Sequence, residues 1–227
     1  LPALNKAKQT AQAVSCINNL KQQNLANCSY TSDNKEYNVP GFECSSGRSD
    51  IFLTKLAVYS GIPGILPDRT RTAANNKTPR TNKSFMCPGE IPENMMTECG
   101  YYYSYLSNRT SKGGLAGDTW IFPQNDTTSG GVKRYGYKLT QLKELSKVAS
   151  FFEGTATKLD GTKTLQRTST TIYIYESLTF ATAATNGFSF RHRLRGNTAY
   201  LDGHVAPWKP EGPFKYTQEC LGANLIN

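Results

Sequence analysis

Hydrophobic residues recur with helical spacing from Leu1 to about Thr31. At about 100° per residue, one side of this segment collects Leu4, Ala7, Ala11, Val14, Ile17, Leu25 and Cys28. The other side is mostly polar and holds Lys6, Gln9, Gln12, Asn19 and Gln23. The pattern predicts one long amphipathic helix. We expect its apolar side to pack, partly on the protein's own sheet and partly on neighbouring molecules.

Two residues of this helix, Cys16 and Leu20, lie away from the apolar side. They meet either a loop of the same chain or a neighbouring molecule, and the sequence leaves both alternatives open.

A second, shorter helix is predicted from Ile51 to Tyr59, with Gly61 suited to the turn that ends it. Its core contacts are expected from Ile51, Leu53, Leu56 and Val58. The stretch 63–83 is rich in Pro, Asn and Arg and is predicted to be an exposed loop.

From Ser84 onward the hydrophobic period shifts towards two, which indicates strands. Candidates are Tyr101 to Leu106, Trp120 to Phe122, Tyr137 to Leu139 before a helical turn at Leu142 to Leu145, Val148 to Phe152, and Thr171 to Tyr175. A final pair of strands is expected to flank a turn at Arg195-Gly196-Asn197.

These elements predict an α+β fold in which the long helix packs on an antiparallel sheet of four to six strands. Long insertions are expected between Phe42 and Asn125. With 227 residues and no linker, the chain is expected to form one domain over residues 1–227. Within it, 1–31 form the helix, 32–100 a helix and loop region, and 101–227 a β-rich region.

The formal net charge of +9 raises the question of an anionic partner, although the cations are scattered along the chain. The dense group is Arg191, His192, Arg193 and Arg195. If the three arginines alternate along one strand, they project from one face opposite Tyr200 and form an anion-binding surface for DNA or an acidic glycan. The favoured interpretation is a basic edge strand that discourages stray pairing, so nucleic acid is not an expected partner.

Six cysteines occur in the chain, none of them in a Cys-x-x-Cys pair, and only two histidines are available as further ligands. Disulfides are therefore expected rather than a metal site. The sequence allows 15 connectivities. Pairing between neighbours favours Cys28 with Cys44 and Cys87 with Cys99, which bracket short segments.

The sequence does not indicate an enzyme. It lacks a Gly-x-Ser-x-Gly motif, a His-Glu-x-x-His motif and paired carboxylates, and its two histidines leave little for acid–base chemistry near neutral pH. No catalytic residue and no cofactor are predicted.

Both ends of the chain resemble a known family. Leu-Pro-Ala-Leu-Asn-Lys-Ala-Lys at the start, Ser15 to Gln22, and Tyr30 to Pro40 are similar to the region after the membrane segment of bacterial prepilin-type proteins. Phe190 to Val205 resembles the His, nine residues, Asp-Gly element of a subgroup called general secretion pathway protein G-like, with His192, Asp202 and Gly203 at its fixed positions. Phe85 to Pro88 and Ser104 to Asn108 resemble weaker landmarks of that subgroup.

The resemblance implies a pilin-like fold and a pseudopilin or pilin subunit of a type II secretion or type IV pilus-like filament in a Gram-negative bacterium. It implies a precursor with a leader, a prepilin-peptidase site and an apolar helix ahead of Leu1. That helix would anchor the subunit in the inner membrane, with the globular part in the periplasm or outside the cell. The implied partners are other pilin subunits, and the implied action is assembly.

Some pseudopilins similar to this chain bind calcium through loop oxygens. Asp118, Asp126 and Asp160 lie in loop-like surroundings, but no Asp-x-Asp spacing supports a site, so calcium is only a minor alternative.

The role of His192 and Asp202 depends on the turn between them. A three-residue loop at Arg195 to Asn197 brings both side chains near one another on one face, whereas a two-residue turn puts them on opposite faces. We expect a structural role, in which the pair fixes the hairpin by hydrogen bonds. Asp202-Gly203 is itself predicted to form a turn.

Overall fold

The computed structural model describes residues 2–40, 42–45, 48–61, 83–90, 96–98, 101–108, 124–126, 133–134, 138–154, 171–172, 189, 191–193 and 195–208. Side chains within several of the short strands lie outside this description.

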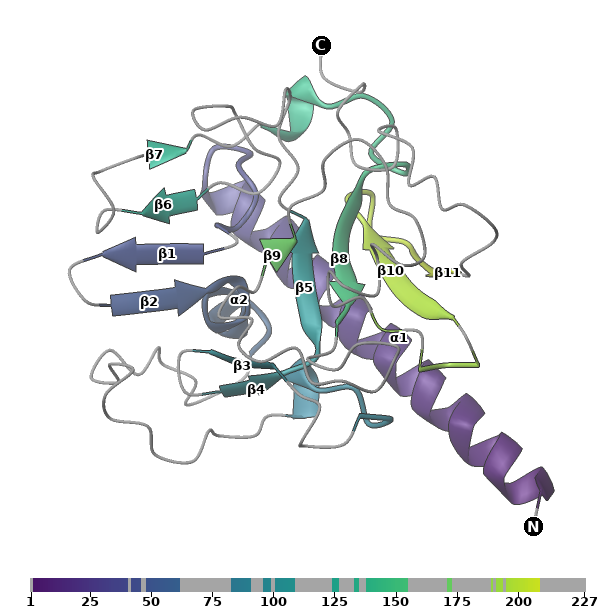
Figure 1. Ribbon diagram of the computed structural model, residues 1–227. Coiled ribbons are helices and arrows are strands. Elements are labelled where there is room, and N and C mark those ends of the chain that lie inside the picture. Colours follow the sequence, from purple (N-terminus) through teal and green to yellow (C-terminus); the bar gives the residue numbers. More distant parts are fainter. Residues whose placement is uncertain are drawn as a thin grey trace.

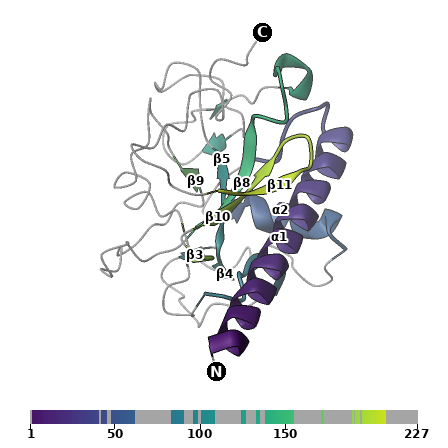
Figure 2. The same cartoon turned by 90° about the vertical axis from the view of Figure 1, so that its right-hand side faces the viewer.

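One long helix, α1 (Pro2–Asp33), packs across one face of the main sheet (Figure 1). Pro2 occupies the first turn, where a missing N–H costs no helical hydrogen bond. The view turned by 90° shows α1 along one side of the molecule, with the strands beside it (Figure 2). Its N-terminal part extends beyond the sheet, and residues 2–11 are all exposed. This is the predicted α+β, pilin-like arrangement.

The main sheet has five strands in the order β11-β10-β8-β5-β9. Their bounds are Val205–Trp208, Gly196–Tyr200, Ala149–Glu153, Tyr105–Asn108 and Thr171–Ile172, in that order. Neighbouring strands are antiparallel except β5 and β9, which run parallel. The helix contacts the antiparallel strands β8, β10 and β11. The strand number lies within the predicted four to six.

Two smaller sheets accompany the main one. The first has the order β2-β1-β6-β7, and the second pairs β3 with β4. Their bounds are β1 Phe42–Ser45, β2 Arg48–Ile51, β3 Met96–Glu98, β4 Tyr101–Tyr103, β6 Gln124–Asp126 and β7 Lys133–Arg134.

The predicted second helix is α2 (Phe52–Tyr59), one residue shorter at its start because Ile51 belongs to β2. Gly61 has φ +64°, the left-handed conformation expected after a helix end. The prediction that Val58 belongs to the core is wrong, since this side chain is 68% exposed. Phe52 takes part in the core instead and stacks on Phe151, with ring centroids 5.0 Å apart.

Other elements agree in part with the sequence-based expectations. Tyr101 to Leu106 is interrupted at Ser104, whose N–H donates to Phe85 O and whose C=O accepts from Gly154 N, so β4 and β5 are separate. The predicted helical turn at 142–145 is instead a 3₁₀ turn at Leu139–Gln141, and a further 3₁₀ turn covers Lys83–Phe85. The expected strand at 120–122 and most of the expected loop at 63–83 lie outside the described residues.

The last hairpin exists as predicted, but the predicted position of its turn, and hence its register, is wrong. Its loop is Leu201–Gly203, and Arg195 lies just before β10 rather than in the hairpin turn. Gly203 N donates to Tyr200 O, Tyr200 N donates to His204 O, and Gly203 has φ +100°. This is a three-residue hairpin loop ending in a left-handed glycine. The predicted Asp202-Gly203 turn is therefore confirmed.

We expect Gly203→Ala to lower the free energy of unfolding by about 1–2 kcal/mol, because a side chain at this φ is strained. A Cβ at Gly203 meets no atom within 4 Å, so the loss comes from the backbone and not from crowding. Chemical denaturation measures it. Gly89→Ala is the matched control, since a Cβ there meets its neighbours only at ordinary contact distances of 3.5 Å or more. Equal stability of both variants contradicts the prediction.

Candidate functional site

The apolar side of α1 faces solvent. Leu4 is 69% exposed, Val14 51% and Leu25 69%, and these are large hydrophobic residues in open positions. Ala7 and Ala11 are exposed as well, and Ile17 is half-buried. For these exposed residues, the prediction of packing on the protein's own sheet is therefore wrong. Their predicted role in assembly stays a prediction. We call Leu4, Ala7, Ala11, Val14 and Leu25 the outer stripe.

The side of α1 that packs on the sheet is the other one. Its buried residues are Cys16, Leu20, Gln23, Asn24, Ala26, Asn27 and Thr31. At about 100° per residue, this side points roughly 175° away from the outer stripe. Part of the side predicted to be polar and solvated is thus the inner side. Of the residues assigned to it, Gln23 is buried and Asn19 is half-buried.

Amide side chains explain why a polar side can be buried. Asn24 Nδ2 donates to Tyr200 O, and Asn24 Oδ1 accepts from Ser150 Oγ at 3.1 Å. Asn27 Oδ1 accepts from Val39 N at 3.0 Å. A buried amide without partners would cost free energy, whereas one that is bonded on both atoms fixes the helix in one orientation.

Asn19 ties the middle of α1 to the segment before β4. Its Nδ2 lies 3.0 Å from Lys83 O, 3.0 Å from Met86 O and 3.2 Å from Tyr105 Oη. Burial, and secondly the nearby charge of Glu153, raises the pKa of the Tyr105 phenol far above its ordinary value. The phenol therefore stays protonated in the folded protein and can donate a hydrogen bond.

A disulfide joins Cys16 of α1 to Cys87, which follows the 3₁₀ turn at Lys83–Phe85, with their Cα atoms 5.2 Å apart. Both predicted local pairs are therefore wrong. Cys28 is a free thiol whose pKa is raised by burial, and Cys99 lies outside the described residues. Of the two alternatives for Cys16, contact with a loop of its own chain is confirmed.

His192 lies in a buried polar cluster beside this disulfide. Its Nε2 is 3.3 Å from Cys87 Sγ and 3.2 Å from Glu153 Oε1. Asn197 Nδ2 donates to the same Glu153 oxygen at 2.7 Å. The Glu153 side chain has no exposed surface, and that of His192 is 7% exposed. Four chain segments thus meet here through side chains: α1, the segment of Cys87 after the 3₁₀ turn, the end of β8 and the turn before β10.

The sequence left open whether His192 and Asp202 lie close together, and in the described part of the chain they have different partners. Asp202 Oδ1 instead accepts from His204 N at 3.1 Å and lies 2.6 Å from His204 Nδ1, and no hydrogen bond or ion pair joins it to His192 among the described residues. The reason is the shifted hairpin, which leaves His192 in a turn ahead of β10 and places Asp202 in the loop after it. His192 therefore contacts Glu153 ahead of the hairpin, whereas Asp202 stabilises the hairpin loop through His204.

The three arginines do not share one strand face. Arg191 is a half-buried residue whose Nη2 lies 2.7 Å from Glu90 Oε2 and whose Nε donates to Ser189 Oγ at 2.6 Å. Residues 191–193 form a turn, and Arg193 has φ +55°. Arg193 and Arg195 are exposed. The geometry on which the alternative of an anion-binding face depended, three arginines alternating along one strand, is therefore not found.

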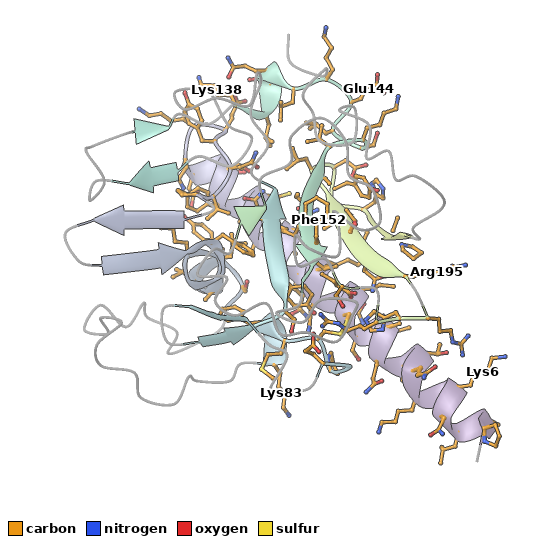
Figure 3. The ribbon with its side chains drawn as sticks, viewed as in Figure 1. Lys6, Lys83, Lys138, Glu144, Phe152 and Arg195 are labelled. Atoms are coloured by element: carbon orange, nitrogen blue, oxygen red, sulfur yellow. A yellow bond between two sulfur atoms is a disulfide. The ribbon has the colours of Figure 1, made fainter. Side chains whose placement is uncertain are left out.

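Figure 3 relates these parts to one another. Lys6 lies on the N-terminal part of α1 beyond the sheet, Phe152 lies within the molecule on β8, and Arg195 lies near the start of β10. The predicted calcium alternative stays untested. Asp118 and Asp160 lie outside the described residues, and the Asp126 side chain is not described.

Comparison with protein-family models, with curated proteins and with solved structures found no match. Among the described residues, no helix has both the length and the apolar character needed to cross a membrane.

Proposed function

We propose that this protein is a pilin-like or pseudopilin subunit of a type II secretion or type IV pilus-like filament, and that it acts by assembly with further copies of itself or related subunits. The observation that carries the proposal is the outward position of the outer stripe on α1. The similarity of both chain ends to prepilin-type proteins supports it.

The orientation of α1 on the sheet is fixed by bonds on its inner side. The inner side is fixed by the Cys16–Cys87 disulfide and by the paired amides of Asn24 and Asn27. Rotating the helix to bury Leu4, Val14 and Leu25 would break these bonds. The protein therefore keeps an apolar stripe in water, and such a surface is typical of a protein–protein contact.

The shape of the outer stripe favours another helix as the surface that packs on it. The stripe runs along α1 from Leu4 in its first turns to Leu25 near its other end, so the matching surface is long and narrow like another helix. Its alanines allow two helix axes to approach to about 8 Å, the close end of the usual range. A second copy of α1 fits this description. Contacts of this kind between identical subunits that do not close into a ring propagate as a filament.

The remaining parts of the proposal follow from the resemblance. An apolar segment ahead of Leu1 would hold the subunit in the inner membrane of a Gram-negative bacterium before assembly. The globular part would then lie in the periplasm or outside the cell. The action requires no catalytic residue.

We expect Val14→Glu to abolish or strongly reduce assembly while changing the free energy of unfolding by less than about 0.5 kcal/mol. Val14 is 51% exposed, so the charge reaches water in the free subunit and is buried only in the contact with another helix. Filament formation in cells that produce the full-length precursor measures the first effect. Thermal unfolding of the present chain measures the second.

Two further variants separate assembly from folding. Gln9→Glu makes the same change in charge at an exposed position off the outer stripe and should assemble normally. Leu20→Glu places the charge at a site with no exposed surface and should unfold the chain. Assembly of Val14→Glu at the level of Gln9→Glu contradicts the proposed contact.

A further inference from the structure

Four side chains that can ligate a metal ion converge beside α1. They are Cys16 of the helix, Cys87 after the 3₁₀ turn at Lys83–Phe85, Glu153 at the end of β8, and His192 in the turn before β10. One ligand atom from each lies within 4.8 Å of all the others, and all four residues are buried. Each comes from a different part of the chain, so no short sequence motif indicates that they form a group.

We propose that this cluster is a zinc site in the reduced protein, and that the Cys16–Cys87 disulfide is the second state of the same site. The ligands are the two Sγ atoms, His192 Nε2 and Glu153 Oε1. Two thiolates, an imidazole and a carboxylate are ligand types that Zn²⁺ binds in a closed, four-coordinate site. The inference is independent of filament assembly.

The distances fit this geometry. Tetrahedral zinc with bonds of about 2.0–2.3 Å keeps its ligand atoms about 3.3–3.8 Å from one another. Cys87 Sγ and His192 Nε2 are 3.3 Å apart, and His192 Nε2 and Glu153 Oε1 are 3.2 Å apart. Once the disulfide is reduced, the two sulfur atoms need to separate to about 3.8 Å.

The polar groups around Glu153 also fit a metal site. Its Oε2 atom is buried and has no hydrogen-bond partner among the residues that the structure describes, which is costly for a carboxylate oxygen in this environment. Asn197 Nδ2 donates to Oε1 at 2.7 Å, and such a hydrogen bond to a ligand would hold the carboxylate in a fixed orientation toward zinc. A divalent cation beside the carboxylate would offset the cost of burying it.

The two states interconvert by balanced steps. A dithiol reductant gives two electrons and two protons to the Sγ–Sγ bond, which breaks, and the reductant becomes a disulfide. Zn²⁺ then displaces both thiol protons to solvent and binds the two thiolates, with His192 binding through an unprotonated Nε2. A disulfide oxidant reverses the first step and releases the metal.

Cobalt titration of the full present chain tests the proposal. After reduction with a dithiol and removal of metal, we expect Co²⁺ to give thiolate-to-cobalt charge-transfer absorption and the visible bands of tetrahedral cobalt at one equivalent, and Zn²⁺ to remove both. The oxidised protein should show neither. Cys28→Ser is the matched control, because its thiol lies outside the cluster, and it should bind as the unaltered chain does.

Variants at His192 distinguish a ligand from a structural residue. His192→Ala should raise the cobalt dissociation constant at least about 100-fold, more than the loss of an outer-shell partner does. His192→Cys should restore binding with stronger charge-transfer absorption, a gain that a purely structural role does not produce. Absence of the bands in the reduced chain, or bands that persist unchanged in His192→Ala, overturns the proposal.

Discussion

Replacement of Cys87 by serine is expected to lower the free energy of unfolding by about 4 kcal/mol. The Cys16–Cys87 disulfide closes a loop with a sequence separation of 71 residues, and a cross-link of this length removes much of the entropy of the unfolded chain. Both cysteines have no exposed surface, so the bond also holds two buried segments together. Equilibrium unfolding in denaturant measures the loss.

The matched control for this prediction is Cys28→Ser, which removes a half-buried thiol that forms no disulfide and should cost far less. Combining Cys16→Ser with Cys87→Ser should cost little more than either change alone, because one bond is lost in all three variants. A Cys87→Ser variant as stable as Cys28→Ser contradicts the expectation.

The second large effect is expected at Glu153. Glu153→Ala should cost about 3 kcal/mol, because it leaves His192 and Asn197 in a buried site without the carboxylate that they contact. The oxidised protein, free of metal, is the form to measure, so that the result reports the hydrogen-bonded cluster alone. Denaturant unfolding again provides the free energy.

Glu153→Gln is the conservative control, because its amide oxygen can still accept from Asn197 Nδ2 while the charge is lost. We expect it to retain more than half of the stability that Glu153→Ala loses. A cycle that combines Glu153→Ala with Asn197→Ala should give a coupling energy of about 1 kcal/mol or more. Additive losses in that cycle would show that the two side chains do not act together.

The general fold could be predicted from local patterns. The helical spacing of residues 1–31 gives α1, the mostly apolar run 148–152 gives most of β8, and Asp202-Gly203 marks a turn because glycine accepts a positive φ. These features depend on neighbours in the sequence. The register of the last hairpin was missed because Arg195-Gly196-Asn197 also looks like a turn and Gly196 instead begins β10.

The side of α1 that packs could not be read from hydrophobicity. Asn24 and Asn27 have polar side chains. In the folded chain these amides are buried because they form hydrogen bonds with Tyr200, Ser150 and Val39. The position of Cys16 and Leu20 off the apolar side was the available signal, and it pointed to the correct inner side.

The buried cluster was beyond sequence reasoning for a related reason. Cys16, Cys87, Glu153 and His192 are separated by dozens of residues, and their approach depends on how three segments pack against α1. Spacing favoured neighbouring cysteines as disulfide partners, whereas the observed bond spans 71 residues. Only a structure brings such residues together.

The position of the disulfide along α1 has a mechanical consequence. Cys16 lies near the middle of the helix, N-terminal to the hydrogen-bonded amides of Asn24 and Asn27. Because of the Cys16–Cys87 disulfide, a force applied to the N-terminal end of α1 is transmitted to the globular part through a covalent bond. The hydrogen bonds of Asn24 and Asn27, farther along the helix, are shielded from that load. The oxidised molecule therefore resists being peeled apart from its exposed end.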